Sequence, residues 1–91
     1  MDFLGNSFRI DHRAMIPRPE TEYMINAVVE QINTMTSVYE ILDLGCGCGV
    51  LGLSSALLGD IKPFALSSRD ISEDAIMLTK DNIHDYQDRL Q

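Results

Sequence analysis

The sequence lacks the features that mark a membrane or secreted protein. No apolar run reaches the ~18 residues that a membrane-spanning helix needs. The first residues, Met1-Asp-Phe-Leu-Gly-Asn6, have neither the basic start nor the apolar stretch of a signal peptide. Two cysteines are too few for a disulfide scaffold. We therefore expect a cytoplasmic chain with reduced thiols.

Basic residues are also scarce. Seven Lys and Arg stand against fourteen Asp and Glu, which gives a formal net charge of −7. A surface that binds nucleic acid or an anionic membrane needs clustered positive charge, so we expect neither partner. An apolar content of 45% is typical of a globular protein, and 91 residues suit one small domain or part of a larger one.

What the chain does have is a glycine-rich segment, Ile41-Leu-Asp-Leu-Gly-Cys-Gly-Cys-Gly-Val50. An apolar strand is followed by three alternating glycines and then by an apolar helix. Glycine tolerates positive φ and lets a ligand lie against the backbone, and the first amides of the helix are unpaired. The segment therefore predicts a loop that holds the polar end of a nucleotide-like cofactor. Asp70 lies 21 positions after Gly49, where a carboxylate commonly binds ribose hydroxyls.

The hydrophobic patterning predicts an α/β chain in which a short hairpin and a helix precede a strand, a helix, a strand and a helix. We expect a hairpin over residues 3–10 with its turn at Gly5-Asn6, and a helix that begins with Pro19. Its apolar stripe is expected at Met24, Ile25, Val28, Val29 and Ile32. The remaining elements are expected at 38–44, 49–58, 64–68 and 72–83, with parallel strands.

Three segments carry a family resemblance: Ile16-Pro-Arg-Pro-Glu-Thr-Glu22, the glycine-rich segment, and Asp70-Ile-Ser-Glu-Asp-Ala75. Together they resemble the HemK/PrmC family, whose members are S-adenosylmethionine-dependent methyltransferases that modify a glutamine side chain of peptide release factors. The resemblance covers nearly the whole chain but only the central portion of the family's length. It implies a partial Rossmann-like class I methyltransferase fold, with residues 1–18 as a hairpin and Pro-Arg-Pro lead-in and 19–91 as the cofactor-binding half.

The resemblance also implies the cofactor and the residues that hold it. The expected cofactor-binding residues are Thr21, Asp43, Gly45, Cys46, Gly47, Cys48, Gly49 and Asp70. The segment from Gly47 to Gly52 also fits the fingerprint of a dinucleotide site, which would take NAD. Because a carboxylate at Asp43 suits the ammonium and sulfonium of S-adenosylmethionine better than a pyrophosphate, we favour S-adenosylmethionine.

Two features set limits on the expected chemistry. The spacing of Cys46 and Cys48 does not suit a structural zinc site, so we expect both to fill the loop and no metal to bind. The family's Asn-Pro-Pro-Tyr motif, which grips the amide to be methylated, does not occur in these 91 residues. We therefore expect no catalytic residue here, and cofactor binding without methyl transfer by this piece alone.

Alternatives remain at this point. The chain is a methyltransferase portion with a release factor as its partner, a non-catalytic remnant that binds the cofactor or only a partner, or part of a nucleic-acid amine methyltransferase. The strand at 38–44 is central in the family but has one neighbour here. Its free edge would expose backbone groups and favour self-association.

Overall fold

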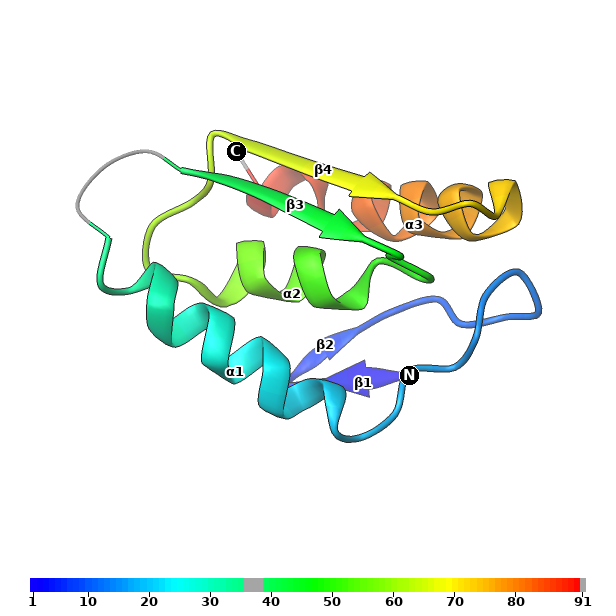
Figure 1. Ribbon diagram of the computed structural model, residues 1–91, viewed down its shortest axis with the longest axis horizontal. Coiled ribbons are helices and arrows are strands. Elements are labelled where there is room, and N and C mark those ends of the chain that lie inside the picture. Colours follow the sequence, from blue (N-terminus) through cyan, green and yellow to red (C-terminus); the bar gives the residue numbers. More distant parts are fainter. Residues whose placement is uncertain (36–38, 91) are drawn as a thin grey trace.

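A computed structural model describes residues 1–35 and 39–90. Its elements are β1 (Asp2–Phe3), β2 (Asn6–Ser7), α1 (Thr21–Ile32), β3 (Glu40–Leu44), α2 (Val50–Leu58), β4 (Ala65–Arg69), α3 (Glu73–Asp85) and a 3₁₀ turn, η1 (Gln87–Leu90). The alternation of strands and helices confirms the mixed α/β prediction (Figure 1). Val38, with which the first long strand was expected to begin, lies outside the described residues. No helix within the described ranges is long and apolar enough to cross a membrane.

The two longer strands form a small parallel sheet, as predicted. Their register runs from Glu40 opposite Ala65 to Leu44 opposite Arg69. Within the described residues β3 pairs with β4 alone, so the backbone groups along its other edge are unpaired. The self-association expected from such an edge stays a prediction.

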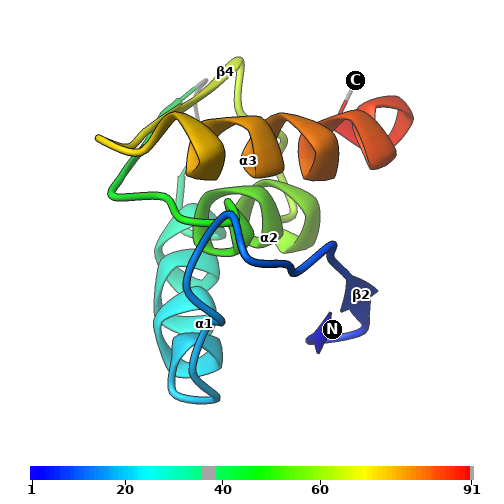
Figure 2. The same cartoon turned by 90° about the vertical axis from the view of Figure 1, so that its right-hand side faces the viewer.

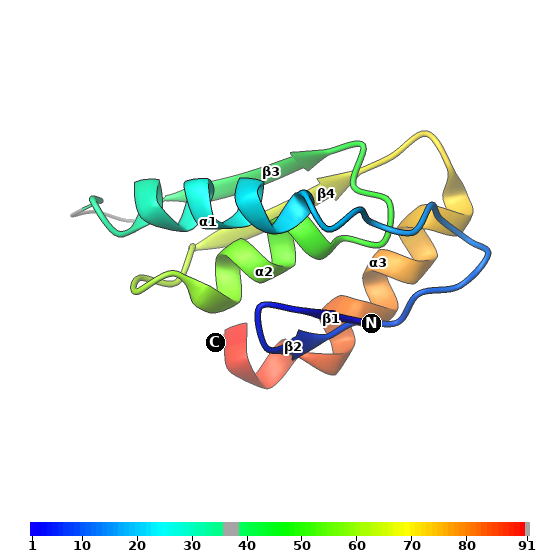
Figure 3. The same ribbon diagram turned by 90° about the horizontal axis from the view of Figure 1, so that it is seen from below.

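The three helices lie on one side of this sheet, with α2 between α1 and α3 (Figures 1 and 3). Side chains alternate along β3 accordingly. Asp43 is buried towards the helices, whereas Leu42 and Leu44 are 61% and 72% exposed on the opposite face. The sheet is therefore covered on one face only.

Helix α2 lies closest to the sheet. It is apolar on nearly all sides, and seven of its nine residues are buried, as the sequence predicted. A Cβ on Gly52 would lie 3.0 Å from Cβ of Asp43 and 3.2 Å from Cδ1 of Leu66. The missing side chain at Gly52 therefore lets the first turn of α2 approach both strands.

The N-terminal arm, defined here as residues 1–14, packs against the helices on the side away from the sheet (Figures 2 and 3). Phe3 and Phe8 are 2% and 3% exposed and join Ile25, Leu53 and Leu78 in the main hydrophobic core. The two phenyl rings meet edge to face with their centroids 6.3 Å apart. The arm therefore closes the core and is part of the fold.

The hairpin of this arm turns one residue earlier than predicted. Leu4 and Gly5, with φ of +48° and +88°, form the turn in place of Gly5 and Asn6. Asn6 instead pairs with Phe3, and its buried side chain accepts a hydrogen bond from Arg89 at 2.9 Å. That tertiary contact keeps Asn6 in the strand and leaves the left-handed turn positions to its predecessors.

Helix α1 also differs from its prediction. It begins at Thr21, and Pro19 lies in a preceding turn in which the Glu22 amide donates to the Pro19 carbonyl at 3.1 Å. Within the expected apolar stripe, Ile25 and Ile32 are buried, but Met24 is 57% exposed. The stripe prediction was wrong for Met24 because this side chain lies beside the site described below.

Two neighbouring serines of α2 provide a stability test. Ser54 and Ser55 are both buried, and Ser55 Oγ donates to the Leu51 carbonyl at 2.7 Å. Ser54 Oγ has no hydrogen-bond partner among the described residues. A buried, unpaired hydroxyl costs about 1–3 kcal/mol, so Ser54→Ala should raise the free energy of unfolding by about 1 kcal/mol.

The matched variant Ser55→Ala gains the same helix propensity but loses a hydrogen bond, and it should not stabilise. Urea unfolding of the two variants checks the difference. Equal effects of the two substitutions would contradict the assignment of Ser54 Oγ as unpaired.

Candidate cofactor site

The carboxyl ends of β3 and β4 lie side by side, and the loop after β3 crosses this edge before α2 begins (Figure 1). The Cys46 amide donates to the Arg69 carbonyl at 2.9 Å, which ties the loop to the end of β4. Ligands of parallel α/β sheets bind at this edge. The structure thus places the glycine-rich loop and Asp70 together where such a site forms.

The three loop glycines all have left-handed backbone conformations, with φ of +67° at Gly45, +56° at Gly47 and +87° at Gly49. A Cβ on Gly49 would lie 2.7 Å from Cγ2 of Thr79, so a side chain is excluded by both conformation and space. A Cβ on Gly45 or Gly47 would meet nothing within 4 Å. The space beside the first part of the loop is therefore open, and a ligand can lie against the backbone there.

Asp70 braces this loop from the end of β4. Its Oδ2 accepts from the Gly47 amide at 3.0 Å, and its Oδ1 accepts from the Ser72 amide at 2.9 Å. These two amides, Ser72 first, hold the pKa of the Asp70 carboxyl below its ordinary value. The carboxylate is therefore a stable negative charge beside the loop, whether or not it also meets a ribose.

Asp43 has a different environment. It is 7% exposed, and its Oδ2 accepts from the Gly52 amide of α2 at 3.2 Å. Burial raises the pKa of this carboxyl; the Gly52 amide opposes the rise, and the negative charge of Asp70 adds to it. Among residues 1–35 and 39–90 no Lys or Arg forms a salt bridge with Asp43, so a cation placed beside it would be favoured.

A hollow of about 240 Å³ opens between the loop and the start of α1. Five of the expected site residues line it: Thr21, Asp43, Gly45, Cys46 and Cys48. A second, more open hollow of about 450 Å³ adjoins it at Leu44 and Gly45 and reaches Asp70. Gly47 and Gly49 shape the loop without lining either hollow.

The lead-in segment forms the far wall of the first hollow. Residues 15–17 line it together with Met24, which explains the exposure of that methionine. Of the neighbouring polar residues, Glu22 is turned to the hairpin, where its Oε2 accepts from the Leu4 amide at 3.1 Å. The segment that carries the family resemblance therefore faces the glycine loop across the hollow.

The two cysteines are buried beside the loop backbone. Burial raises the pKa of both the Cys46 and the Cys48 thiols, so they are protonated and weakly nucleophilic near neutral pH. Cys46 Sγ lies 3.3 Å from Thr79 Oγ1. Among residues 1–35 and 39–90 no three side chains of His, Cys, Asp or Glu gather as a metal site requires. That the two cysteines only fill the loop stays a prediction.

Two residues of α3 that hold the loop were missed by the sequence reasoning. Thr79 Oγ1 donates to the Gly47 carbonyl at 2.8 Å, and Asn82 Nδ2 donates to the Cys48 carbonyl at 2.8 Å. Both side chains lie on the buried face of α3 with Ala75 and Leu78. A polar residue at a core position of a helix was the available signal.

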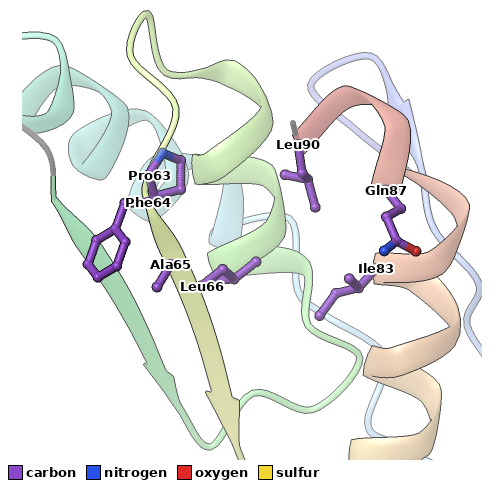
Figure 4. A pocket seen from close by; sticks show the side chains of 7 residues that line it. All are labelled: Pro63, Phe64, Ala65, Leu66, Ile83, Gln87 and Leu90. Carbon is purple, nitrogen blue, oxygen red and sulfur yellow. The ribbon is translucent and has the colours of Figure 1, made fainter.

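A further hollow of about 250 Å³ lies at the other end of β4, between its first residues and the end of α3 (Figure 4). Its walls come mainly from apolar side chains, among them Phe64, Leu66, Ile83 and Leu90. It contains no residue of the glycine loop. This hollow is therefore separate from the candidate site.

Comparison with known proteins fits this geometry. The family model for ribosomal protein L11 methyltransferase (PrmA) matches residues 18–89, which include the whole loop and both carboxylates. The chain belongs to this methyltransferase family. Membership implies a Rossmann-like methyltransferase fold, in agreement with the alternating strands and helices.

Individual methyltransferases match over a longer stretch. The release factor glutamine methyltransferase of Streptococcus pneumoniae is 37% identical over 82 residues, which are 89% of this chain and 28% of that protein. Its namesakes in Clostridium botulinum and Bacillus subtilis are 32% and 31% identical, over 99% and 88% of this chain. These matches confirm the HemK/PrmC resemblance. The chain spans less than a third of the length of these relatives.

The loop geometry predicts different costs for two alanine substitutions. Gly45→Ala should cost about 1–2 kcal/mol, the usual penalty for a left-handed residue with a Cβ. Gly49→Ala should cost about 3 kcal/mol, because its Cβ would also press against Thr79. Chemical unfolding of both variants measures the difference, and equal losses would contradict the packing of Gly49 on α3.

Proposed function

We propose that this chain is the S-adenosylmethionine-binding portion of a protein glutamine methyltransferase that acts on peptide release factors. One observation carries the cofactor part of the proposal: the two hollows that meet at Gly45 are lined by Asp43 in one and by Asp70 in the other. S-adenosylmethionine would supply an activated methyl group on a sulfonium. The residues of this chain would bind and orient it.

Each part of the proposed site suits a different part of that cofactor. The hollow beside Asp43, with its apolar wall at residues 15–17, suits the methionine end, whose ammonium and sulfonium are cationic. The more open hollow at Asp70 suits the ribose, whose hydroxyls would donate to a carboxylate. The two hollows meet at Gly45, so one extended ligand can occupy both.

The same charges argue against NAD, the alternative that the glycine spacing left open. A pyrophosphate would bring negative charge to a loop that already has Asp43 and Asp70 beside it. The hollow that Asp43 lines contains no Lys or Arg side chain to neutralise that charge, and the adjoining hollow has Arg69 but also the Asp70 carboxylate. A cationic cofactor is therefore the better electrostatic match.

The substrate part of the proposal rests on the relatives. Their printed name, release factor glutamine methyltransferase, and the shared Pro-Arg-Pro-Glu-Thr-Glu segment favour a protein amide as the methyl acceptor. Methyl transfer to an amide requires groups that hold its nitrogen in line with the sulfonium methyl. We propose that these 91 residues bind the cofactor without transferring its methyl group, which leaves a non-catalytic binding role as the alternative for the piece by itself.

Calorimetry tests the cofactor part. S-adenosylmethionine should bind, NAD should not, and Gly45→Ala should weaken binding at least about tenfold because its methyl group would fill the ligand's space. The control is Gly5→Ala, which has the same kind of strain, with φ of +88° and open surroundings, but lies in the hairpin. Gly5→Ala should weaken binding much less than Gly45→Ala does. Absence of heat with S-adenosylmethionine would overturn the proposal.

The raised pKa of Asp43 predicts the pH dependence of binding. Since a cationic ligand favours the ionised carboxyl, binding expels the proton, and affinity should fall as the pH is lowered through the raised pKa. The pH dependence of folding has the opposite sign. The raised pKa of Asp43 stabilises the fold at pH values below the ordinary carboxyl pKa, and this stabilisation is lost as the pH rises through the raised pKa.

Titrations of the cofactor at a series of pH values measure this dependence. Asp43→Asn should flatten it and weaken binding at neutral pH. Asp60→Asn, which changes an exposed carboxylate beyond the end of α2, should preserve it. A profile that Asp43→Asn leaves unchanged would remove Asp43 from the site.

A further inference from the structure

The N-terminal arm is bound to the same face of α3 that holds the glycine loop. The Ser7 amide donates to Tyr86 Oη at 2.8 Å, and Tyr86 Oη donates to the Ser7 carbonyl at 2.6 Å. The rings of Phe8 and Tyr86 pack with their centroids 5.6 Å apart. The arm and α3 run in opposite directions, so later arm residues meet earlier residues of the helix.

Asn82 stands where the arm and the loop meet. Its Oδ1 accepts from the Arg9 amide at 2.6 Å, and its Nδ2 donates to the Arg9 carbonyl at 3.1 Å and to the Cys48 carbonyl at 2.8 Å. The side chain is completely buried. One carboxamide thus satisfies a donor and an acceptor of the arm and an acceptor of the loop.

The chemistry of this position is specific to asparagine. It requires one acceptor and two donors on a single short side chain, and a buried aspartate, leucine or serine would leave at least one backbone group unpaired. Two of its three backbone partners belong to the arm and the third belongs to the loop. Removing the carboxamide therefore breaks a bridge between the arm and the loop, while Tyr86 still holds the arm and Thr79 still holds the loop.

We propose that Asn82 is a positioning residue through which docking of the N-terminal arm fixes the conformation of the glycine loop. The arm continues into residues 15–17, which wall the hollow opposite the loop, so one side chain contacts both segments that border the hollow. The effect of Asn82 on cofactor affinity rests on the proposed function. Its effect on the loop does not.

The other arm contacts on α3 do not reach the loop. Arg9 forms a two-pronged pair with Asp85, with nitrogen–oxygen distances of 2.7 and 2.8 Å, and Arg13 pairs with Asp81 at 2.8 Å. The Arg9 side chain is 55% exposed, so solvent screens its pair and its contribution is small. Asp85→Asn is therefore a matched control on the same helix.

Amide hydrogen exchange, measured without any ligand, tests the coupling. In Asn82→Ala the amides of Gly47 and Gly49, which donate to Asp70 Oδ2 and to the Cys46 carbonyl, should exchange roughly tenfold faster relative to the core amides of α2. Asp85→Asn should change them less than about twofold. A uniform rise over loop and core alike would mean general destabilisation and would overturn the proposal.

The second variant is Tyr86→Phe, which removes both Ser7 hydrogen bonds while keeping the ring and touching no loop residue. It should raise loop exchange roughly threefold by itself, and add nothing at the loop in an Asn82→Ala background. This variant also carries the test should Asn82→Ala fail to fold. Unchanged loop exchange in Tyr86→Phe, or additive effects in the double variant, would overturn the coupling.

Cofactor titrations on the same variants separate this inference from the proposed function. If the unaltered chain binds no S-adenosylmethionine, the proposed function fails while the exchange result still decides the coupling. If it binds and Asn82→Ala keeps full affinity with unchanged loop exchange, the coupling fails and the proposed function stands. If Asn82 positions the loop as inferred, Asn82→Ala should lower both the cofactor affinity and the protection of the loop amides from exchange.

Discussion

The fold depends on a backbone constraint: the chain must pass from the end of β3 into α2 within residues 45–49 while it stays bound to the end of β4. Left-handed glycines allow the turn, and the Arg69 carbonyl, Asp70 and two side chains of α3 hold it. The sheet, α2 and α3 therefore meet at this loop. Because the same backbone borders the open hollows, the interactions that complete the fold also shape the site.

The two carboxylates beside the loop illustrate how environment separates chemically equal groups. Amide donors hold the pKa of Asp70 down, and burial raises that of Asp43. Asp70 is thus a stable anion that holds the loop backbone. Asp43 is a buried carboxyl whose ionised form is poorly solvated and would be stabilised by a cationic ligand. Their shared presence favours a ligand with positive charge at one end and hydroxyls at the other.

Local signals sufficed for much of this architecture. Ser72 caps α3 by accepting from the Ala75 amide, and the glycine spacing placed the loop, because both depend on neighbours in sequence. Predictions failed where distant residues decide. Arg89 keeps Asn6 in its strand, and Met24 lines a hollow whose other wall comes from residues 15–17 and the glycine loop. Thr79 and Asn82 were missed since their partners lie over thirty positions away.

The contacts of the arm also set an order of folding. Ser7 meets Tyr86 across 79 positions, and Arg9 meets Asn82 across 73. During synthesis on a ribosome, the β1–β2 hairpin must wait until α3 and Tyr86 have been made before it finds its place. Such distant closures slow folding and leave Phe3 and Phe8 uncovered meanwhile. The nascent chain is therefore most open to chaperones or proteases until α3 has been made.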